Sequence, residues 1–288
     1  MDITFFFIQL LNALQYGLVL FLVASGLTLI FGIMGIINLA HGSFYMIGAW
    51  LAWWLTGMIG NFAVAIAVGI VITVVIGMLL ERLIIRGFYN RDHLYQVLLT
   101  FGLILVFEEL RSIFWGNDVQ SMRVPEVFDY SIALTEQLSY SVYRLFTTIF
   151  CIGVAIALYL LIKHTKLGMT IRAGASNRQM VQSLGINISF LYMLVFAMGV
   201  GLAAFAGLIN SPISSVYPNM GGHVMIMSFV VVVIGGIGSV KGAFIASLLI
   251  GLAEVFGQLL IPTMAGMTVY VLMAAVLLWR PQGLFQQA

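Results

Sequence analysis

The chain has 288 residues, of which 62% are hydrophobic and only 8% are charged. A soluble domain carries about 25% charged residues, so this composition excludes a water-soluble globular protein. The formal net charge of +2 is too small to favour binding to nucleic acid, and the single cysteine, Cys151, excludes a disulfide framework. The composition therefore predicts an integral membrane protein that crosses the lipid bilayer many times.

Apolar runs of suitable length follow one another along the chain. A helix needs about 20 apolar residues to cross the hydrocarbon core. The predicted spans are 5–31, 35–56, 61–80, 95–115, 143–162, 187–210, the glycine-interrupted stretch 223–260, and a short last run at 265–279. We therefore expect an all-α helix bundle in a single transmembrane domain over residues 1–288. It has eight or nine crossings, depending on whether 223–237 crosses fully or is re-entrant.

The connecting loops differ in charge, and this difference predicts the orientation. Loops 81–94 and 163–186 are basic, whereas loop 116–142 is acidic. The basic residues are Arg82, Arg86, Arg91, Lys163, Lys166, Arg172 and Arg178, and the acidic ones are Asp118, Glu126, Asp129 and Glu136. Because Lys and Arg collect on the cytoplasmic side, the basic loops and the C-terminus are predicted to be cytoplasmic. Loop 116–142 and the N-terminus are then periplasmic.

Small residues recur at every fourth position in three of the predicted spans. The series are Gly69, Thr73 and Gly77; Gly199, Ala203 and Gly207; and Ala243, Ser247 and Gly251. Helices in lipid associate through close backbone contact, which small residues allow. The series predict a tightly packed bundle and imply no chemistry.

Two glycine-rich segments interrupt the apolar runs. Residues 32–42 place Asn38 and His41 among glycines, and residues 233–242 form a similar segment later in the chain. The corresponding residues are Gly35 and Gly235, Ile37 and Ile237, Gly42 and Gly242, and Phe44 and Phe244. Transporters are often built from repeats whose broken helices line the transport path. Asn38 and His41 either line or gate such a path or cap helix ends, and the sequence leaves both interpretations open.

Few residues offer chemistry inside the membrane. Intramembrane carboxylates are functional candidates by default, and here they are Glu108, Glu109 and Glu254. Glu108 and Arg111 are three residues apart and can pair on one helix face. Three scattered carboxylates suit structural roles better than a proton relay. The sequence has no GxxxxGKS/T phosphate-binding loop and no HExxH metal motif, so we assign no catalytic residue, metal ligand or cofactor to this chain.

The basic loop 163–186 has a pattern of its own. Residues 169–184 are typical of a short amphipathic helix bounded by Gly168 and Gly185. Its apolar residues are Ile171, Met180, Val181 and Leu184. A helix too short and too polar to span suits docking to a soluble cytoplasmic partner, but its basic residues also favour adhesion to anionic headgroups. Composition alone does not separate docking from adhesion.

Four sequence blocks stand out along the chain. They are residues 26–49 (GLTLIFGIMGIINLAHGSFYMIGA), residues 165–186 with the pattern TKLG…IRA…NR…LGI, residues 231–243 (VVVIGGIGSVKGA) and residues 279–285 (WRPQGLF). Together and in this order, they resemble the branched-chain amino acid ABC permeases of the LivH type. The resemblance extends from one end of the chain to the other and implies a multi-pass subunit of an importer in the bacterial inner membrane.

The resemblance also implies partners and site residues. A second homologous permease subunit would complete the pathway, two cytoplasmic ATPase subunits would bind ATP and Mg²⁺, and a periplasmic binding protein would deliver the substrate. The residues that match the family's cytoplasmic coupling segment are Leu167, Gly168, Arg172, Ala173, Asn177 and Gly185. Those that match its glycine-rich membrane motifs, with a path or gating role, are Asn38, His41, Gly42, Gly235 and Gly236. The expected function is translocation of branched-chain amino acids by alternating access.

Two other functions remain open on the sequence alone. Amide and urea permeases share these motifs, so the substrate could instead be urea or a short-chain amide. The chain could also be an ion-coupled secondary transporter that works without ATPases. That interpretation requires titratable residues along the path, and the scarcity of carboxylates counts against it.

Overall fold

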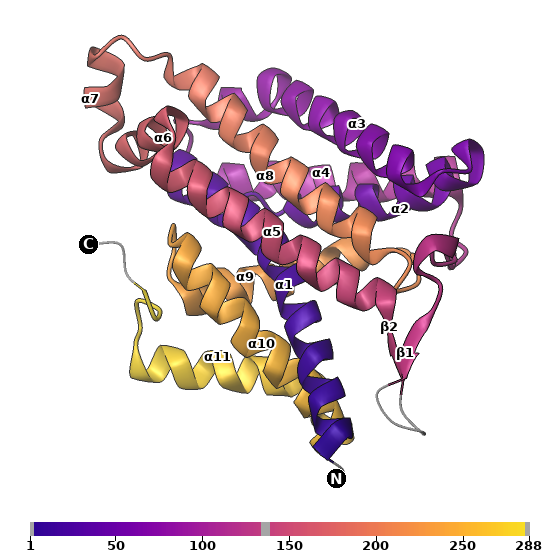
Figure 1. Ribbon diagram of the computed structural model, residues 1–288. Coiled ribbons are helices and arrows are strands. Elements are labelled where there is room, and N and C mark those ends of the chain that lie inside the picture. Colours follow the sequence, from indigo (N-terminus) through magenta and orange to yellow (C-terminus); the bar gives the residue numbers. More distant parts are fainter. Residues whose placement is uncertain (1–2, 134–138, 286–288) are drawn as a thin grey trace.

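The computed structural model describes residues 3–133 and 139–285, so Glu136 of the predicted acidic loop lies outside the described residues. The chain is mostly helical, as the sequence predicts (Figure 1). The α-helices are α1 (Ile3–Met34), α2 (His41–Ile59), α3 (Phe62–Leu83), α4 (His93–Trp115), α5 (Val142–His164), α6 (Lys166–Ser176), α7 (Arg178–Ser183), α8 (Ile188–Asn210), α9 (Met220–Gly235), α10 (Val240–Leu260) and α11 (Thr268–Trp279). Short 3₁₀ helices lie at η1 (Ile85–Phe88), η2 (Glu126–Phe128) and η3 (Pro262–Met267).

One small element departs from the predicted all-α fold. Strands β1 (Ser131–Ala133) and β2 (Ser139–Ser141) pair antiparallel in the loop that we predict to be periplasmic. A bridge between Gln120 and Val216 joins this loop to the segment between α8 and α9. The two longest loops of this end are therefore tied together.

Most of the predicted spans correspond to helices. Within the described residues, five helices are long and apolar enough to cross a membrane, namely α1, α3, α5, α8 and α10, whereas α9 and α11 are apolar but shorter. The predicted interruption of 223–260 is confirmed, because α9 ends at Gly235 and α10 begins at Val240. The start predicted at residue 35 is wrong, since residues 35–40 are non-helical and α2 begins at His41. The number of crossings and the orientation of the termini stay predictions.

Helix α1 lies at the centre of the bundle. Every residue from Gly17 to Ile30 is buried, and the helix packs against α8 and α10 (Figure 1). A Cβ atom at Gly26 would come within 2.6 Å of the carbonyl oxygen of Gly199 in α8. At Gly17 it would come within 2.8 Å of the carbonyl oxygen of Ser247 in α10. The small residues therefore bring the helix backbones into contact, as predicted.

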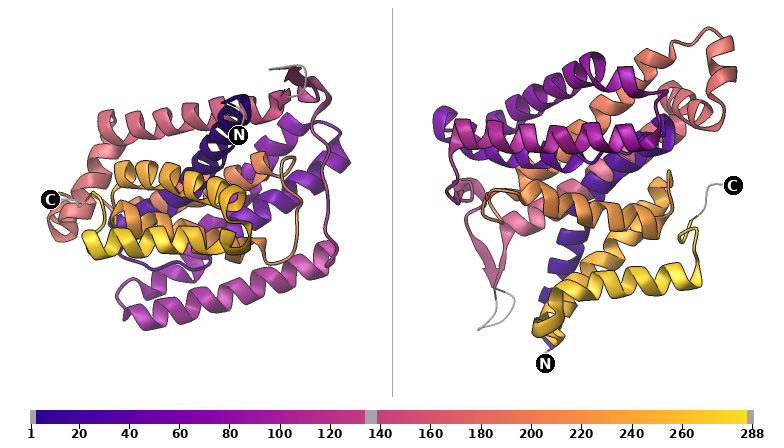
Figure 2. Two further views of the ribbon diagram at one scale, coloured as in Figure 1. Left: turned by 90° about the horizontal axis from the view of Figure 1, so that it is seen from below. Right: turned by 180° about the vertical axis from the view of Figure 1, so that it is seen from behind.

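Helix α3 buries one narrow face. Its buried residues are Ala65, Gly69, Thr73, Gly77 and Glu81, each four positions from the next. Cβ atoms at Gly69 and Gly77 would come within 2.8 and 2.9 Å of the side chains of Leu208 and Val200 in α8. The right-hand view of Figure 2 shows α3 and α4 on one side of the bundle and α10 and α11 on the other. The buried face of α3 is therefore a line of small residues that ends at Glu81, and the glycines of this line contact α8.

Candidate functional site

The break between α1 and α2, residues 35–40, is closed by its own side chains. Gly35 ends α1 in the left-handed region, with φ of 65°. The Oδ1 atom of Asn38 accepts a hydrogen bond from the backbone N–H of Ala40 at 3.1 Å, and the carbonyl of Asn38 accepts from the N–H of His41 at 3.3 Å. These contacts satisfy backbone donors that a helix start leaves unpaired. Asn38 therefore pairs with backbone groups of the break, whereas Ala40, the N-cap residue of α2, has no side-chain cap hydrogen bond.

His41, the first residue of α2, connects this break to the middle of α1. Its Nε2 atom lies 3.0 Å from the carbonyl oxygen of Val23. The side chains of both Asn38 and His41 are completely buried. Among the residues that the structure describes, the amide nitrogen of Asn38 and the Nδ1 atom of His41 have no hydrogen-bond partner. In this conformation the two side chains hold the break in place and do not reach the surface, whereas the predicted gating role stays untested.

Gly42 lies where α2 crosses the start of α9. A Cβ atom at this position would come within 2.7 Å of the Cβ of Met225 and would overlap the carbonyl oxygen of Gly221. A larger residue at position 42 would push α2 and α9 apart. The glycine is therefore required by the close approach of two helices.

The break between α9 and α10, residues 236–239, is closed from elsewhere in the chain. Gly236 and Gly238 have φ of 95° and 79°. The N–H groups of Leu284 and Phe285 donate to the carbonyls of Ile234 and Gly235, at 2.8 and 3.2 Å. The last carbonyls of a helix have no partner within the helix, and these N–H groups supply one from outside it. We call residues 280–285, which supply these donors, the C-terminal strap.

The two breaks meet inside the bundle. A Cβ atom at Gly32, near the end of α1, would come within 2.7 Å of the Cα of Gly238. Leu39 of the first break also packs against two buried residues, Leu27 of α1 and Val232 of α9. The structure therefore brings together the two glycine segments that the sequence relates to one another.

The predicted amphipathic helix of 169–184 is two helices, and the prediction of one is wrong. Helix α6 begins after Thr165, whose hydroxyl accepts from the N–H of Gly168 at 3.0 Å. Asn177 ends α6 and caps α7 by accepting from the N–H of Met180 at 2.9 Å. Gly185, with φ of 82°, follows α7. Asn is a strong N-cap residue, so the separation at position 177 follows from local sequence.

The residues predicted for the coupling segment have different environments. Gly168 lies against the carbonyls of Leu161 and Ile162 at the end of α5, and the guanidinium of Arg172 donates to the carbonyl of Ile162. Leu167 packs against the core, and Ala173 is exposed. Gly168 and Arg172 therefore fix α6 to α5.

The apolar residues of α6 and α7 do not form one buried face. Ile171 and Val181 are 3% exposed, whereas Met180 and Leu184 are 62% and 71% exposed. Two of the four apolar residues thus anchor the helices, and the other two are free to contact lipid or protein.

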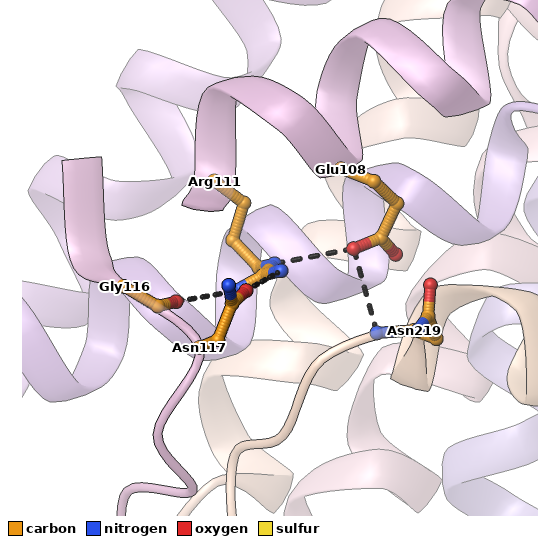
Figure 3. A network of polar contacts seen from close by, with 5 residues as sticks. All are labelled: Glu108, Arg111, Gly116, Asn117 and Asn219. Carbon is orange, nitrogen blue, oxygen red and sulfur yellow. Dashed lines mark hydrogen bonds and ion pairs between the residues drawn. The ribbon is translucent and has the colours of Figure 1, made fainter. Parts of the chain in front are cut away.

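A polar network fixes the opposite end of α9 (Figure 3). The carboxylate of Glu108 lies 3.1 Å from Nε of Arg111, which confirms the predicted pairing, and accepts from the N–H of Asn219 at 3.4 Å. Asn219, with φ of 61°, directly precedes α9. The guanidinium of Arg111 also donates to Asn117 at 2.9 Å and to the carbonyl of Gly116. A carboxylate beside a helix N-terminus is favourable, so Glu108 ties the start of α9 to α4.

The other intramembrane carboxylates lie apart from this network. Glu109 is exposed, and Glu254 accepts a hydrogen bond from Gln258 of the same helix at 2.7 Å. In the described part of the chain, His, Cys, Asp and Glu residues form no group of three that could hold a metal ion. Glu108 therefore has the ion pair that the sequence predicts, whereas one oxygen of Glu254 is buried without a hydrogen-bond partner among the described residues.

These features define a membrane protein built from long apolar helices with two glycine breaks at its centre. Residues 9–278 match the family described as the permease component of branched-chain amino acid transport systems, and the chain belongs to that family. It is 31% identical to the high-affinity branched-chain amino acid transport permease BraD of Pseudomonas aeruginosa, over 96% of this chain and 94% of that protein. It is 28% identical to LivH of Salmonella typhimurium, over 97% and 95%.

More distant similarities exist as well. The chain is 26% identical to the ribose import permease RbsC of Escherichia coli, over 84% of this chain and 75% of that protein. Among solved structures, PsaBC from Streptococcus pneumoniae in complex with a Fab has a TM-score of 0.50 at 13% identity, over 93% of this chain and 89% of that chain. At this identity the likeness shows a shared fold alone.

Proposed function

We propose that this chain is the permease subunit of an ABC importer that carries branched-chain amino acids across the bacterial inner membrane. The observation that carries the proposal is the similarity to BraD and LivH over almost their whole length. The fold supports it, because long apolar helices surround two glycine breaks that are suited to bending. A second homologous permease, two ATPase subunits and a periplasmic binding protein complete the machine.

The orientation follows the charges of the loops. The basic turn between α3 and α4, the helices α6 and α7, and the C-terminus face the cytoplasm, and the acidic loop of the hairpin faces the periplasm. With α2, α4, α9 and α11 counted among the crossings, the chain has nine. The ATPases then meet α6 and α7.

In this proposal α6 and α7 receive the movement of the ATPases. Gly168 and Arg172 fix α6 to the end of α5, so a displacement of α6 pulls on that span. Asn177 and Gly185 bound α7 and allow it to turn, and Leu167 and Ala173 complete the surface. ATP and Mg²⁺ are bound by the partners.

The glycine breaks serve as hinges. Residues 35–40 and 236–239 are points where no continuous helix resists bending. Asn38 and Gly236 lie in these breaks, and His41, Gly42 and Gly235 flank them in α2 and α9. Alternating access then follows from rotation of the helix pairs about these points. Substrate selection lies mainly with the binding protein, since the buried side chains of the breaks offer little direct contact.

Uptake of labelled leucine into liposomes tests the proposal. The vesicles hold the chain with its ATPases and second permease, and the binding protein is added outside. We expect uptake only with ATP inside, a large loss in Arg172→Glu, and near-normal uptake in Lys166→Glu, a matched charge reversal on α6. Lys166 is a suitable control because its side chain has no described contact to α5.

Two outcomes would contradict the proposal in different ways. Uptake that ignores ATP and follows a proton gradient would exclude an ABC importer. ATP hydrolysis stimulated by the binding protein without leucine uptake would retain the machine and reject the substrate, and urea would then be the next compound to test.

A further inference from the structure

Helix α7 is attached to the membrane helices through two residues, Arg178 and Val181. Among its six residues, all described, Val181 is the only buried one. The guanidinium carbon of Arg178 lies 5.2 Å from the ring centre of Tyr192 in α8, and its Nη1 atom lies 3.4 Å from Oδ1 of Asn90. A cation over an aromatic ring is held by the quadrupole of that ring. A displacement of α7 must therefore act on Arg178 and Val181.

Tyr192 passes this contact on to the turn between α3 and α4. It is only 2% exposed, and the ring of Tyr89 packs edge-on against it at 5.1 Å and 81°. Edge-to-face packing has a preferred geometry, so a shift of one ring displaces the other. A movement of the Tyr192 ring is therefore expected to move the Tyr89 ring.

The contacts end on a buried carboxylate. The hydroxyl of Tyr89 donates a hydrogen bond to Glu81, which is 1% exposed at the end of α3. A buried carboxylate is costly without a partner, also at the end of a membrane helix. The other buried residues of that face are Ala, Gly or Thr. Packing against α8 therefore does not explain a glutamate at position 81.

Much of the surface of α3 is not covered by other helices of this chain. Its contact with α8 is the line of small residues at positions 65, 69, 73 and 77, against which the side chains of Leu208 and Val200 pack. The outward-facing side chains of α3, among them Val68, Val71 and Val75, are exposed and are not held by other helices of this chain. A pull at Glu81 therefore acts on the end of a helix that is held along one narrow face.

We propose that Arg178, Tyr192, Tyr89 and Glu81 are positioning residues that transmit the displacement of α7 to α3. The proposal rests on the proposed function, in which the ATPases move α6 and α7. It adds the route by which one of these helices moves a membrane helix.

Distances between spin labels test the route in the complete transporter. Because Cys151 is the single cysteine of this chain, a Cys151→Ala variant can be labelled at new cysteines before it is assembled with its partners. The pair Gln179→Cys with Ile156→Cys reports the position of α7 relative to α5, and Leu83→Cys with Ile156→Cys reports that of α3. All three sites are exposed. Both distances are measured without nucleotide and with ATP trapped by vanadate.

Tyr89→Phe is the decisive variant, since it keeps the ring against Tyr192 and removes only the hydroxyl that reaches Glu81. Tyr95→Phe, at an exposed tyrosine of α4, is the matched control. We expect ATP to shift both distances in the unmodified background and in Tyr95→Phe. In Tyr89→Phe the α7 distance still shifts, the α3 distance does not, and leucine taken up per ATP hydrolysed falls about fivefold, the size of one lost hydrogen bond. Glu81→Gln, which can still accept from Tyr89, keeps most of the coupling, and Glu81→Leu loses it.

The outcomes separate the two proposals. An α3 shift in Tyr89→Phe equal to that of the control overturns the route and leaves the importer intact. An α7 distance that ATP does not change in any variant, although leucine is still imported, overturns the coupling role of α7 and the route with it.

Discussion

The two glycine breaks solve one physical problem in different ways. Each break leaves backbone groups without a partner inside a helix, at the start of α2 in the first and at the end of α9 in the second. Residues 35–40 are closed locally, by Asn38 and by His41 at the start of α2. Residues 236–239 are closed by the C-terminal strap, whose N–H groups reach back to Ile234 and Gly235. One break therefore carries its own cap, and the other depends on the far end of the chain.

The difference also appears at the left-handed glycines. A Cβ atom at Gly35 would meet no atom within 4 Å, whereas a Cβ atom at Gly236 would come within 2.5 Å of the carbonyl oxygen of Phe285. The first glycine is needed for its backbone angle alone. The second is also needed to let the strap approach, so the second break is the more vulnerable to substitution.

The largest effect is expected from alanine at these two glycines. Gly236→Ala combines an unfavourable backbone angle with displacement of the strap and should cost about 3 kcal/mol of unfolding free energy. Gly35→Ala has only the unfavourable backbone angle and should lower the unfolding free energy by about 1 kcal/mol. Thermal unfolding of the purified variants in detergent measures both values. Equal losses would mean that the strap adds nothing to the second break.

A smaller effect is expected from removing one donor of the strap. Leu284→Pro lacks the N–H that pairs with Ile234 and leaves a buried carbonyl unsatisfied, at about 2 kcal/mol. Hydrogen exchange should rise in peptides covering the end of α9 and remain unchanged around residues 35–40. Leu284→Ala keeps the donor and serves as the control. Faster exchange at both breaks would show that they are not closed independently.

The smallest effect is expected at the local cap of the first break. Asn38→Ala removes the acceptor for the N–H of Ala40 and should cost about 1 kcal/mol. Asn38→Ser retains a side-chain oxygen that can accept from the same donor and should recover part of the loss. Unfolding in detergent compares the two variants. Exchange at the end of α9 should be unaffected, and a change there would contradict the separation of the breaks.

The sequence predicts the features that depend on nearby residues. Apolar runs give the helices, glycines give the breaks, and the spacing of Glu108 and Arg111 gives their ion pair. The division of α6 from α7 was also encoded locally, since Asn177 is a good N-cap, but the apolar periodicity around it favoured one helix. Local pattern thus located most elements, but it placed the start of α2 too early and missed both the division at Asn177 and the β1–β2 pair.

Contacts between distant segments could not be predicted in this way. The strap joins residues 284 and 285 to the end of α9, and no periodicity in either segment indicates the other. The sequence pattern assigns no role to Glu81, because its burial and its hydrogen bond depend on Tyr89 and on the packing of α3. For the candidate site, the glycine breaks and the polar residues beside them could therefore be predicted from the sequence. The contact of Arg178 with Tyr192 could not.

The central position of α1 has a consequence for the order of assembly. The chain is synthesised from its N-terminus, so α1 enters the membrane before α8 and α10, its main neighbours, exist. Until then, Thr28 and the glycines of its packing face have only lipid or temporary partners around them. The helix that is made first is therefore among the last to complete its packing, and a chain that stops before α10 lacks one wall of its core.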